Sequence, residues 1–88
     1  MAWKIEYDPR VEKDLKAIDR AMQREILDYI DTRIATEEDP RRFGKPLRHE
    51  LRGLWRYRVR DYRIICEIRE ESDVVFVVTI KHRSIVYD

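Results

Sequence analysis

Apolar and polar residues recur with two different periods in the N-terminal half of the chain, and each period predicts one type of element. Residues 3–7 (W-K-I-E-Y) alternate between apolar and polar side chains, which is typical of a half-buried strand. The pair Asp8-Pro9 then predicts a helix start, with the aspartate as N-cap and the proline as first helical residue. Apolar residues at helical spacing follow in two stripes that are interrupted near Asp19: Val11, Leu15 and Ile18, then Met22, Ile26, Tyr29 or Ile30, and Ile34. A strand and two helices that end near Glu38 are therefore predicted.

The C-terminal half predicts strands. Residues 39–46 (D-P-R-R-F-G-K-P) contain two prolines and a glycine, which favours a loop. Residues 54–60 and 62–69 alternate in polarity, and the polar residues 70–73 predict a turn after them. Residues 74–80 (V-V-F-V-V-T-I) form a continuous apolar, largely β-branched run, which is typical of a strand buried on both faces.

The resulting order of elements is β-α-α-β-β-β. It predicts an α+β fold in which a helical hairpin packs on a twisted antiparallel sheet. A chain of 88 residues has the size of one domain, so residues 1–88 are expected to form a single domain. The one cysteine, Cys66, cannot form an intramolecular disulfide or a zinc site of several cysteines. No apolar run reaches the roughly 20 residues that span a bilayer, and the N-terminus does not resemble a signal peptide. A cytoplasmic protein without membrane association is therefore expected.

The net charge of +1 conceals an uneven distribution of charge along the chain. Residues 41–63 contain nine lysines and arginines against two acidic residues, a net charge of +7. Residues 1–40 have a net charge of −4 and residues 64–88 a net charge of −2. A basic block between acidic ends is typical of a protein that binds a polyanion. The alternative is a solvated charged surface that only keeps the protein in solution.

Residues 56–63 (R-Y-R-V-R-D-Y-R) concentrate this positive charge in a predicted hairpin. If Arg60 and Asp61 form a two-residue turn, Arg58 lies directly opposite Arg63, on the face away from the core. Like charges in this register destabilise a sheet by up to about 1 kcal/mol. An anion between the two side chains explains the arrangement, because guanidinium groups bind phosphate oxygens bidentately. The hairpin is therefore predicted to bind phosphate.

The end of the chain adds side chains that could take part in chemistry. Lys81, His82 and Arg83 follow the predicted last strand directly, and Tyr87 comes four residues later. Such a set beside a phosphate-binding face is suited to cleaving RNA without a metal, because the 2′-hydroxyl attacks once a base removes its proton. The alternative is a structural role, in which these side chains only pack at the end of the strand.

Two segments together resemble a known family of proteins. Residues 45–68 (K-P-L-R-H-E-L-R-G-L-W-R-Y-R-V-R-D-Y-R-I-I-C-E-I) and residues 74–87 (V-V-F-V-V-T-I-K-H-R-S-I-V-Y) resemble the RelE branch of the RelE/ParE toxin superfamily. The most specific part is G-L-W-R-Y-R-V-x-D-Y-R, followed by a late H-R pair and a final tyrosine. The resemblance extends over essentially the whole chain and implies a RelE-like, microbial-RNase-like fold.

The resemblance also implies a function and its partners. Toxins of the RelE branch belong to type II toxin–antitoxin systems and cleave mRNA in the A site of the ribosome, next to 16S rRNA. They use neither a metal nor an organic cofactor, and they leave a 2′,3′-cyclic phosphate. A cognate RelB-like antitoxin is expected to keep the toxin inactive.

Individual roles follow from the same resemblance. Arg58, Arg60 and Arg63 match residues that hold the scissile phosphate, Arg83 matches an arginine that stabilises developing charge, and Tyr87 matches the tyrosine proposed as base. A well-known family member has lysines where this chain has Arg58 and Arg60, and arginine almost never releases a proton. Histidine titrates near neutral pH, so His82 is the expected replacement acid. The predicted catalytic residues are Arg63, His82, Arg83 and Tyr87, and the predicted RNA contacts are Lys45, Arg56, Arg58, Arg60 and Lys81.

Two other functions remain open at this stage. A ParE-like protein would inhibit DNA gyrase through protein contacts, without nuclease activity, and would have no need for His82 and Tyr87 together. A non-catalytic nucleic-acid-binding module would bind RNA with a steep salt dependence and would not arrest growth.

Overall fold

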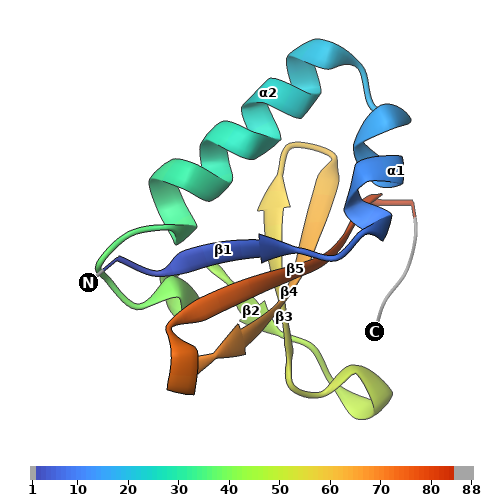
Figure 1. Ribbon diagram of the computed structural model, residues 1–88. Helices are drawn as coiled ribbons and strands as arrows, with labels where there is room; N and C mark the ends of the chain where they lie inside the picture. Colours follow the sequence, from blue (N-terminus) through green and yellow to red (C-terminus); the bar gives the residue numbers. More distant parts are fainter. Residues whose placement is uncertain (1, 85–88) are drawn as a thin grey trace.

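The structure is a computed structural model that describes residues 2–84 of the chain. Its helices and strands confirm the predicted α+β class and the predicted order of the longer elements (Figure 1). These elements are β1 (Lys4–Tyr7), α1 (Arg10–Lys16), α2 (Arg20–Tyr29), β2 (Lys45–Pro46), β3 (Leu54–Val59), β4 (Tyr62–Arg69) and β5 (Val74–His82). Short helical turns connect them at Ile30–Ile34, Pro40–Phe43, His49–Leu51 and Glu70–Ser72.

The strands form one five-stranded sheet in the order β1-β5-β4-β3-β2. Adjacent pairs from β2 to β5 are antiparallel, whereas β1 lies parallel to β5. The predicted antiparallel sheet is therefore confirmed for β2 to β5 but not for β1, which can run parallel to β5 because a long connection separates them. The prediction of a loop over residues 39–46 also missed β2, whose two residues are too few to show a period. Pro46 is tolerated there because β2 is an edge strand.

The ends of the two helices are set by side chains. The Asp8 Oδ1 atom accepts a hydrogen bond from the Arg10 backbone N–H at 2.9 Å, and α1 begins at Arg10, one residue later than predicted. Asp19 is the N-cap of α2 and accepts from the Met22 N–H at 2.9 Å. The Gln23 amide donates to the carbonyls of Leu15 and Ile18 at 2.6 and 2.7 Å. These last bonds satisfy carbonyls at the end of α1 and hold the two helices together.

The second helix ends earlier than the predicted position near Glu38. It continues as a π-helical turn over Ile30–Ile34, and the Ala35 N–H donates to the Ile30 carbonyl at 2.9 Å. Ala35 then leaves the helical region with a ψ of 57°. The apolar stripe stops at Ile34, and the polar residues after it have no core face to cover.

The core lies between the helices and one face of the sheet. Ile26, Ile30 and Ile34 from the second helical segment pack with Tyr57 and with apolar residues of β4 and β5, and all are fully buried. A register irregularity between Ile65 and Cys66 interrupts the alternation of β4, so Ile64, Ile65 and Cys66 are all buried. Burial raises the pKa of the Cys66 thiol, which behaves as a small apolar side chain.

Tyr57 attaches the connection before β2 to the core. Its side chain is 0% exposed, and its hydroxyl donates to the Pro40 carbonyl at 2.7 Å. The backbone at Gly44 approaches the same ring so closely that a Cβ there would lie 2.9 Å from it. Burial raises the pKa of Tyr57, so the hydroxyl keeps its proton and remains a donor. Residues 40–46 are therefore held against β3.

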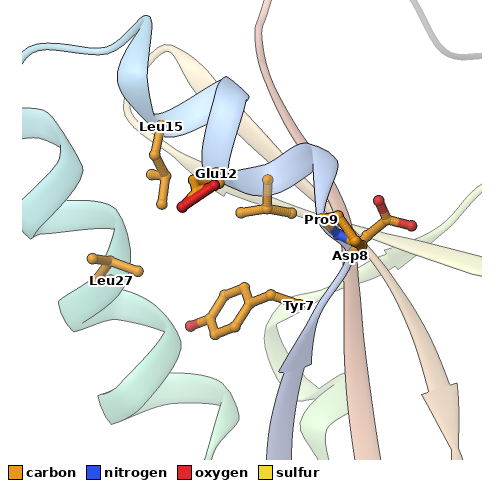
Figure 2. A pocket seen from close by; sticks show the side chains of 7 residues that line it. Tyr7, Asp8, Pro9, Glu12, Leu15 and Leu27 are labelled. Atoms are coloured by element: carbon orange, nitrogen blue, oxygen red, sulfur yellow. The ribbon is translucent and has the colours of Figure 1, made fainter.

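A hollow of about 370 Å³ lies at the other side of the molecule, between α1, α2 and the end of β1. Apolar side chains of both helices line it, including Leu15 and Leu27. Figure 2 shows the Tyr7 ring directed between the two helices, toward Leu27. Tyr7 remains 41% exposed, and its partial burial raises the pKa of the hydroxyl.

We expect Tyr57→Phe to lower the free energy of unfolding by about 1–3 kcal/mol, because the buried Pro40 carbonyl loses its donor. Urea unfolding at neutral pH measures this. Tyr7→Phe is the matched control, since it removes the hydroxyl of a half-exposed tyrosine and should change stability by less than about 0.5 kcal/mol. Equal stability of the two variants would show that the Tyr57 hydrogen bond does not hold residues 40–46.

Candidate functional site

The hairpin between β3 and β4 has the register that the sequence predicted. Val59 pairs with Tyr62, Arg58 with Arg63, and Tyr57 with Ile64. Arg60, in the turn, has a φ of 52°. A non-glycine residue in this left-handed region is strained by roughly 1–2 kcal/mol. Glycine would adopt this conformation more easily, and the pairing of β3 with β4 holds Arg60 in it.

The positive residues of three strands line up across the sheet. Arg58 on β3 pairs with Arg63 on β4, and Arg63 pairs with Lys81 on β5. We call these three residues the basic row. The neighbouring row, Tyr57, Ile64 and Ile80, belongs to the core and is buried. Because side chains alternate between the two faces of a strand, the basic row lies on the face away from the core.

A pocket of about 180 Å³ lies beside the basic row. It is lined by Phe43, Lys45, Arg56 and Arg58, and we call it the basic pocket. Lys45 on β2 pairs with Arg56 on β3, which brings two cations together at this edge of the sheet. Within residues 2–84, none of the three cations of the pocket forms an ion pair. Their charges repel one another, so the pocket is suited to an anion such as phosphate.

Three other cationic residues of the predicted site have acidic partners. Arg60 pairs with Glu25 of α2, the Lys81 Nζ atom lies 3.1 Å from Asp14 of α1, and the Arg83 Nε atom lies 3.4 Å from Asp61 in the turn. The Arg60 and Arg83 side chains are 70% and 66% exposed, and exposed ion pairs contribute only about 0–1 kcal/mol. A phosphate group could therefore replace the carboxylates of Glu25 and Asp61 at little cost.

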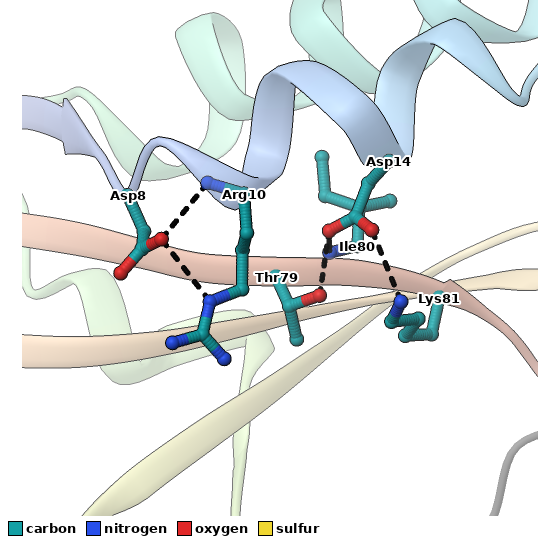
Figure 3. Close-up of polar contacts among 6 residues, drawn as sticks. All are labelled: Asp8, Arg10, Asp14, Thr79, Ile80 and Lys81. Carbon is teal, nitrogen blue, oxygen red and sulfur yellow. Dashed lines mark hydrogen bonds and ion pairs between the residues drawn. The ribbon is translucent and has the colours of Figure 1, made fainter.

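Asp14 anchors the outer part of β5 to α1 (Figure 3). In the described sheet β1 pairs only with residues 74–77, so the edge of β5 beyond them is not covered by a strand. Asp14 accepts hydrogen bonds there from the Thr79 hydroxyl at 2.6 Å, the Ile80 N–H at 3.0 Å and the Lys81 ammonium at 3.1 Å. Burial acts to raise the pKa of Asp14, but these three donors outweigh it and hold the pKa below its usual value.

His82 does not lie in the basic row. It pairs with Tyr62, and its ring meets the Tyr62 ring edge-on with the centroids 5.3 Å apart. Tyr62 packs against the core, so the imidazole lies on the helix side of the sheet. The Ser84 N–H donates to its Nδ1 atom at 3.2 Å, which in a neutral ring leaves the proton on Nε2. Tyr87, the predicted base, lies outside the described residues, and its catalytic role stays a prediction.

The sequence did not indicate the acidic partners or Phe43. Asp14, Glu25 and Asp61 had no local signal that would single them out, because Asp14 and Glu25 meet their cations only through the tertiary fold. Phe43 had a signal, since it is an aromatic residue in a basic, proline-containing segment. Among residues 2–84, no helix is long and apolar enough to cross a membrane, and no group of three or more His, Cys, Asp or Glu could hold a metal ion.

The sequence from residue 5 to residue 87 matches the family described as the ParE toxin of the type II toxin–antitoxin system parDE. The chain therefore belongs to this family of toxins, and the predicted membership of the RelE/ParE superfamily is confirmed. Toxin RelG of Mycobacterium tuberculosis is 26% identical over 87 residues, which are 99% of this chain and 98% of RelG.

Solved structures share the fold. The crystal structure of the toxin–antitoxin complex RelBE2 from M. tuberculosis contains a chain with a TM-score of 0.87 and 24% identity, covering 97% of this chain and 95% of that one. The archaeal RelE–RelB complex from Pyrococcus horikoshii has a TM-score of 0.74 and 24% identity, over 98% of this chain and 100% of that one. The isolated E. coli RelE toxin has a TM-score of 0.70 and 17% identity, over 92% and 84%. The RelE-like fold predicted from the sequence is thus confirmed.

We expect Asp14→Asn to lower the stability at pH 7 and to reduce the loss of stability in acid. A depressed pKa in the folded state contributes stability that is present above the unfolded value of about 3.9 and is lost as the pH falls through the folded value. Urea unfolding from pH 7 down to pH 3 measures both effects. Asp28→Asn, an exposed carboxylate on α2, is the control. An acid dependence of Asp14→Asn as steep as that of wild type would contradict the role of Asp14.

Proposed function

We propose that this toxin inhibits translation by cleaving mRNA in the A site of the ribosome. The observation that carries the proposal is the basic row, in which Arg58, Arg63 and Lys81 stand in register on one face of three neighbouring strands. The row continues into the basic pocket through Arg58. A face that concentrates guanidinium groups in this way is suited to the phosphates of a single strand of RNA. Membership of a family of type II toxins supports the role as a toxin.

The proposed reaction is a transfer within the RNA. The 2′-oxygen of the nucleotide before the cut attacks the adjacent phosphorus, and its proton passes to a base. The bond from phosphorus to the 5′-oxygen of the next nucleotide then breaks, and that oxygen takes up a proton. The products are a 2′,3′-cyclic phosphate and a 5′-hydroxyl. Arg58 and Arg63 would hold the phosphate and stabilise the negative charge that grows on its oxygens.

The residues after β5 would complete the site. Arg83 follows the last strand, and its backbone N–H donates to the Asp61 carbonyl in the hairpin turn at 2.6 Å. This bond keeps Arg83 beside the hairpin, where its guanidinium group would stabilise the pentacovalent intermediate. Tyr87 would remove the proton from the 2′-hydroxyl, which requires nearby cations to favour its phenolate form. The geometry supports a positioning role for His82, whose Nδ1 atom accepts a hydrogen bond from the Ser84 N–H. Its role as an acid stays a prediction.

The proposal includes two partners. Neighbours in fold were solved as RelE–RelB complexes, which supports a RelB-like antitoxin as the partner of this toxin. An acidic, largely helical antitoxin segment over the hairpin would neutralise the basic pocket and block RNA. The other partner is the ribosome with its bound mRNA and 16S rRNA, so the proposed place of action is the cytoplasm.

We expect Arg58→Ala, Arg83→Ala and Tyr87→Phe each to slow mRNA cleavage by about a hundredfold or more, because each removes charge stabilisation or the base. Cleavage is measured by mapping mRNA ends in a reconstituted translation reaction, with growth arrest recorded after induced expression. Lys4→Ala is the control, since it removes an exposed cation from β1, at the opposite edge of the sheet from β2. Growth arrest with intact mRNA and inhibited DNA gyrase would instead favour the ParE-like function.

We expect the charge reversals Arg56→Glu and Arg58→Glu together to weaken binding of the antitoxin encoded beside the toxin by at least tenfold, because an acidic partner would meet like charge. Size-exclusion chromatography and titration calorimetry of the mixed proteins measure this. Lys4→Glu is the control. It also replaces a cation with an anion, but on β1, and it should leave binding unchanged. Equal affinities for the three proteins would show that the antitoxin binds elsewhere.

A further inference from the structure

Phe43 is a large apolar side chain that stays in contact with solvent at a basic site. It is 42% exposed, and it lines the basic pocket together with Lys45, Arg56 and Arg58. Two more guanidinium groups lie over its ring, with the Cζ atoms of Arg33 and Arg42 at 5.4 and 4.7 Å from the ring centroid. A base that stacks on the ring would therefore share or replace these cation–π contacts. The ring contributes little to the core, so burial does not explain an aromatic residue at this position.

The segment that carries Phe43 is held firmly. Pro40 is buried and its carbonyl accepts from Tyr57, while Gly44 packs directly on the Tyr57 ring. Lys45 then enters the sheet as the partner of Arg56. Residues on both sides of Phe43 are therefore fixed to β3. A fixed ring binds a flat partner at a smaller entropic cost than a ring on a loose loop.

We propose that Phe43 and the basic pocket form a nucleotide subsite for single-stranded RNA, in which a base stacks on the Phe43 ring and its phosphate binds Lys45 and Arg56. The inference rests on the proposed function, and it adds a base-binding residue and the place of a neighbouring nucleotide. An aromatic ring beside cations that track the backbone is the usual combination for binding single strands. Arg58 belongs to both the pocket and the basic row. The subsite therefore holds a nucleotide next to the phosphate that the row would hold.

The charges around the ring fit this occupant. The cations of the pocket form no ion pair within residues 2–84, so the phosphate does not have to displace a carboxylate there. Arg42 pairs with Glu38 at 3.3 Å, which keeps its guanidinium near the ring without adding a free charge. A planar guanidinium can also stack on a base. Recognition by stacking is tolerant of base identity, as a protein that cuts many messages requires.

The first test measures stacking directly with the purified protein. The probe is a short oligouridylate that carries one 2-aminopurine, whose fluorescence falls when it stacks on an aromatic ring. We expect wild type and Phe43→Trp to quench the probe, and Phe43→Ala to lose the quenching and bind about tenfold more weakly. Tyr7→Ala, which removes an aromatic residue of nearly equal exposure on β1, should behave as wild type. Equal quenching by wild type and Phe43→Ala, or none by wild type, would overturn the subsite.

The second test assigns the phosphate-binding side chains. For Lys45→Ala and Arg56→Ala, the slope of the logarithm of the binding constant against the logarithm of salt concentration should fall by about 0.7 for each phosphate that the variant no longer neutralises. Lys4→Ala should leave the slope unchanged. Circular dichroism and urea unfolding of every variant show whether the fold is kept, which we expect because Lys45 is exposed and Arg56 is not fully buried. Unchanged slopes in folded Lys45→Ala and Arg56→Ala would remove both residues from the subsite.

A cleavage assay separates this inference from the proposed function. If ribosome-bound mRNA is cut by wild type and kcat/KM falls about tenfold for Phe43→Ala but not for Phe43→Trp, both proposals stand. Cutting by wild type and Phe43→Ala at equal rates would overturn the subsite and leave the nuclease in place. Quenching that depends on Phe43, with no cutting by wild type, would support an RNA-binding subsite and overturn the nuclease.

Discussion

The packing of Tyr57 is the interaction on which the rest of this structure depends. The ring is fully buried between the second helical segment and the sheet, and its hydroxyl reaches out of the core to the Pro40 carbonyl. Gly44 is needed beside it because a Cβ would meet the ring at 2.9 Å. One side chain thus joins the hydrophobic core to the segment that forms β2. Together with the pairing of β2 and β3, this attachment holds Lys45 and Phe43 beside Arg56, where they line the basic pocket.

The fold distributes charge so that a basic face can exist on a nearly neutral protein. The acidic N-terminal half supplies Asp14 and Glu25, which pair with Lys81 and Arg60 at the ends of the basic strands. These pairs reduce charge repulsion at the ends of the basic strands. The cations of the basic pocket form no ion pair within the described residues, so their charges are not neutralised there. Positive potential is therefore concentrated in one hollow of the surface, and a local field of this kind draws a polyanion toward a particular place.

The similarity to the solved toxins concerns the backbone far more than the side chains. A TM-score of 0.87 accompanies only 24% identity with the chain of the M. tuberculosis complex. The fold therefore tolerates replacement of most residues as long as the apolar pattern of the helices and strands is kept. Function depends instead on side chains placed on that backbone. In this chain the proposed function assigns that part to arginines on β3 and β4 and to an exposed phenylalanine before β2.

The sequence by itself determined the longer elements and the hairpin, because both depend on neighbours along the chain. Alternating polarity and a two-residue turn were enough to pair Arg58 with Arg63. Contacts between distant residues were decided only by the tertiary structure. Strand β1 pairs in parallel with β5, Asp14 forms an ion pair with Lys81, and Glu25 forms one with Arg60. No local sequence pattern connects these residues. The position of His82 illustrates the limit. The strand β5 extends past Ile80 to His82. Because side chains two residues apart lie on the same face of a strand, the imidazole lies on the helix side with Ile80, away from the basic row.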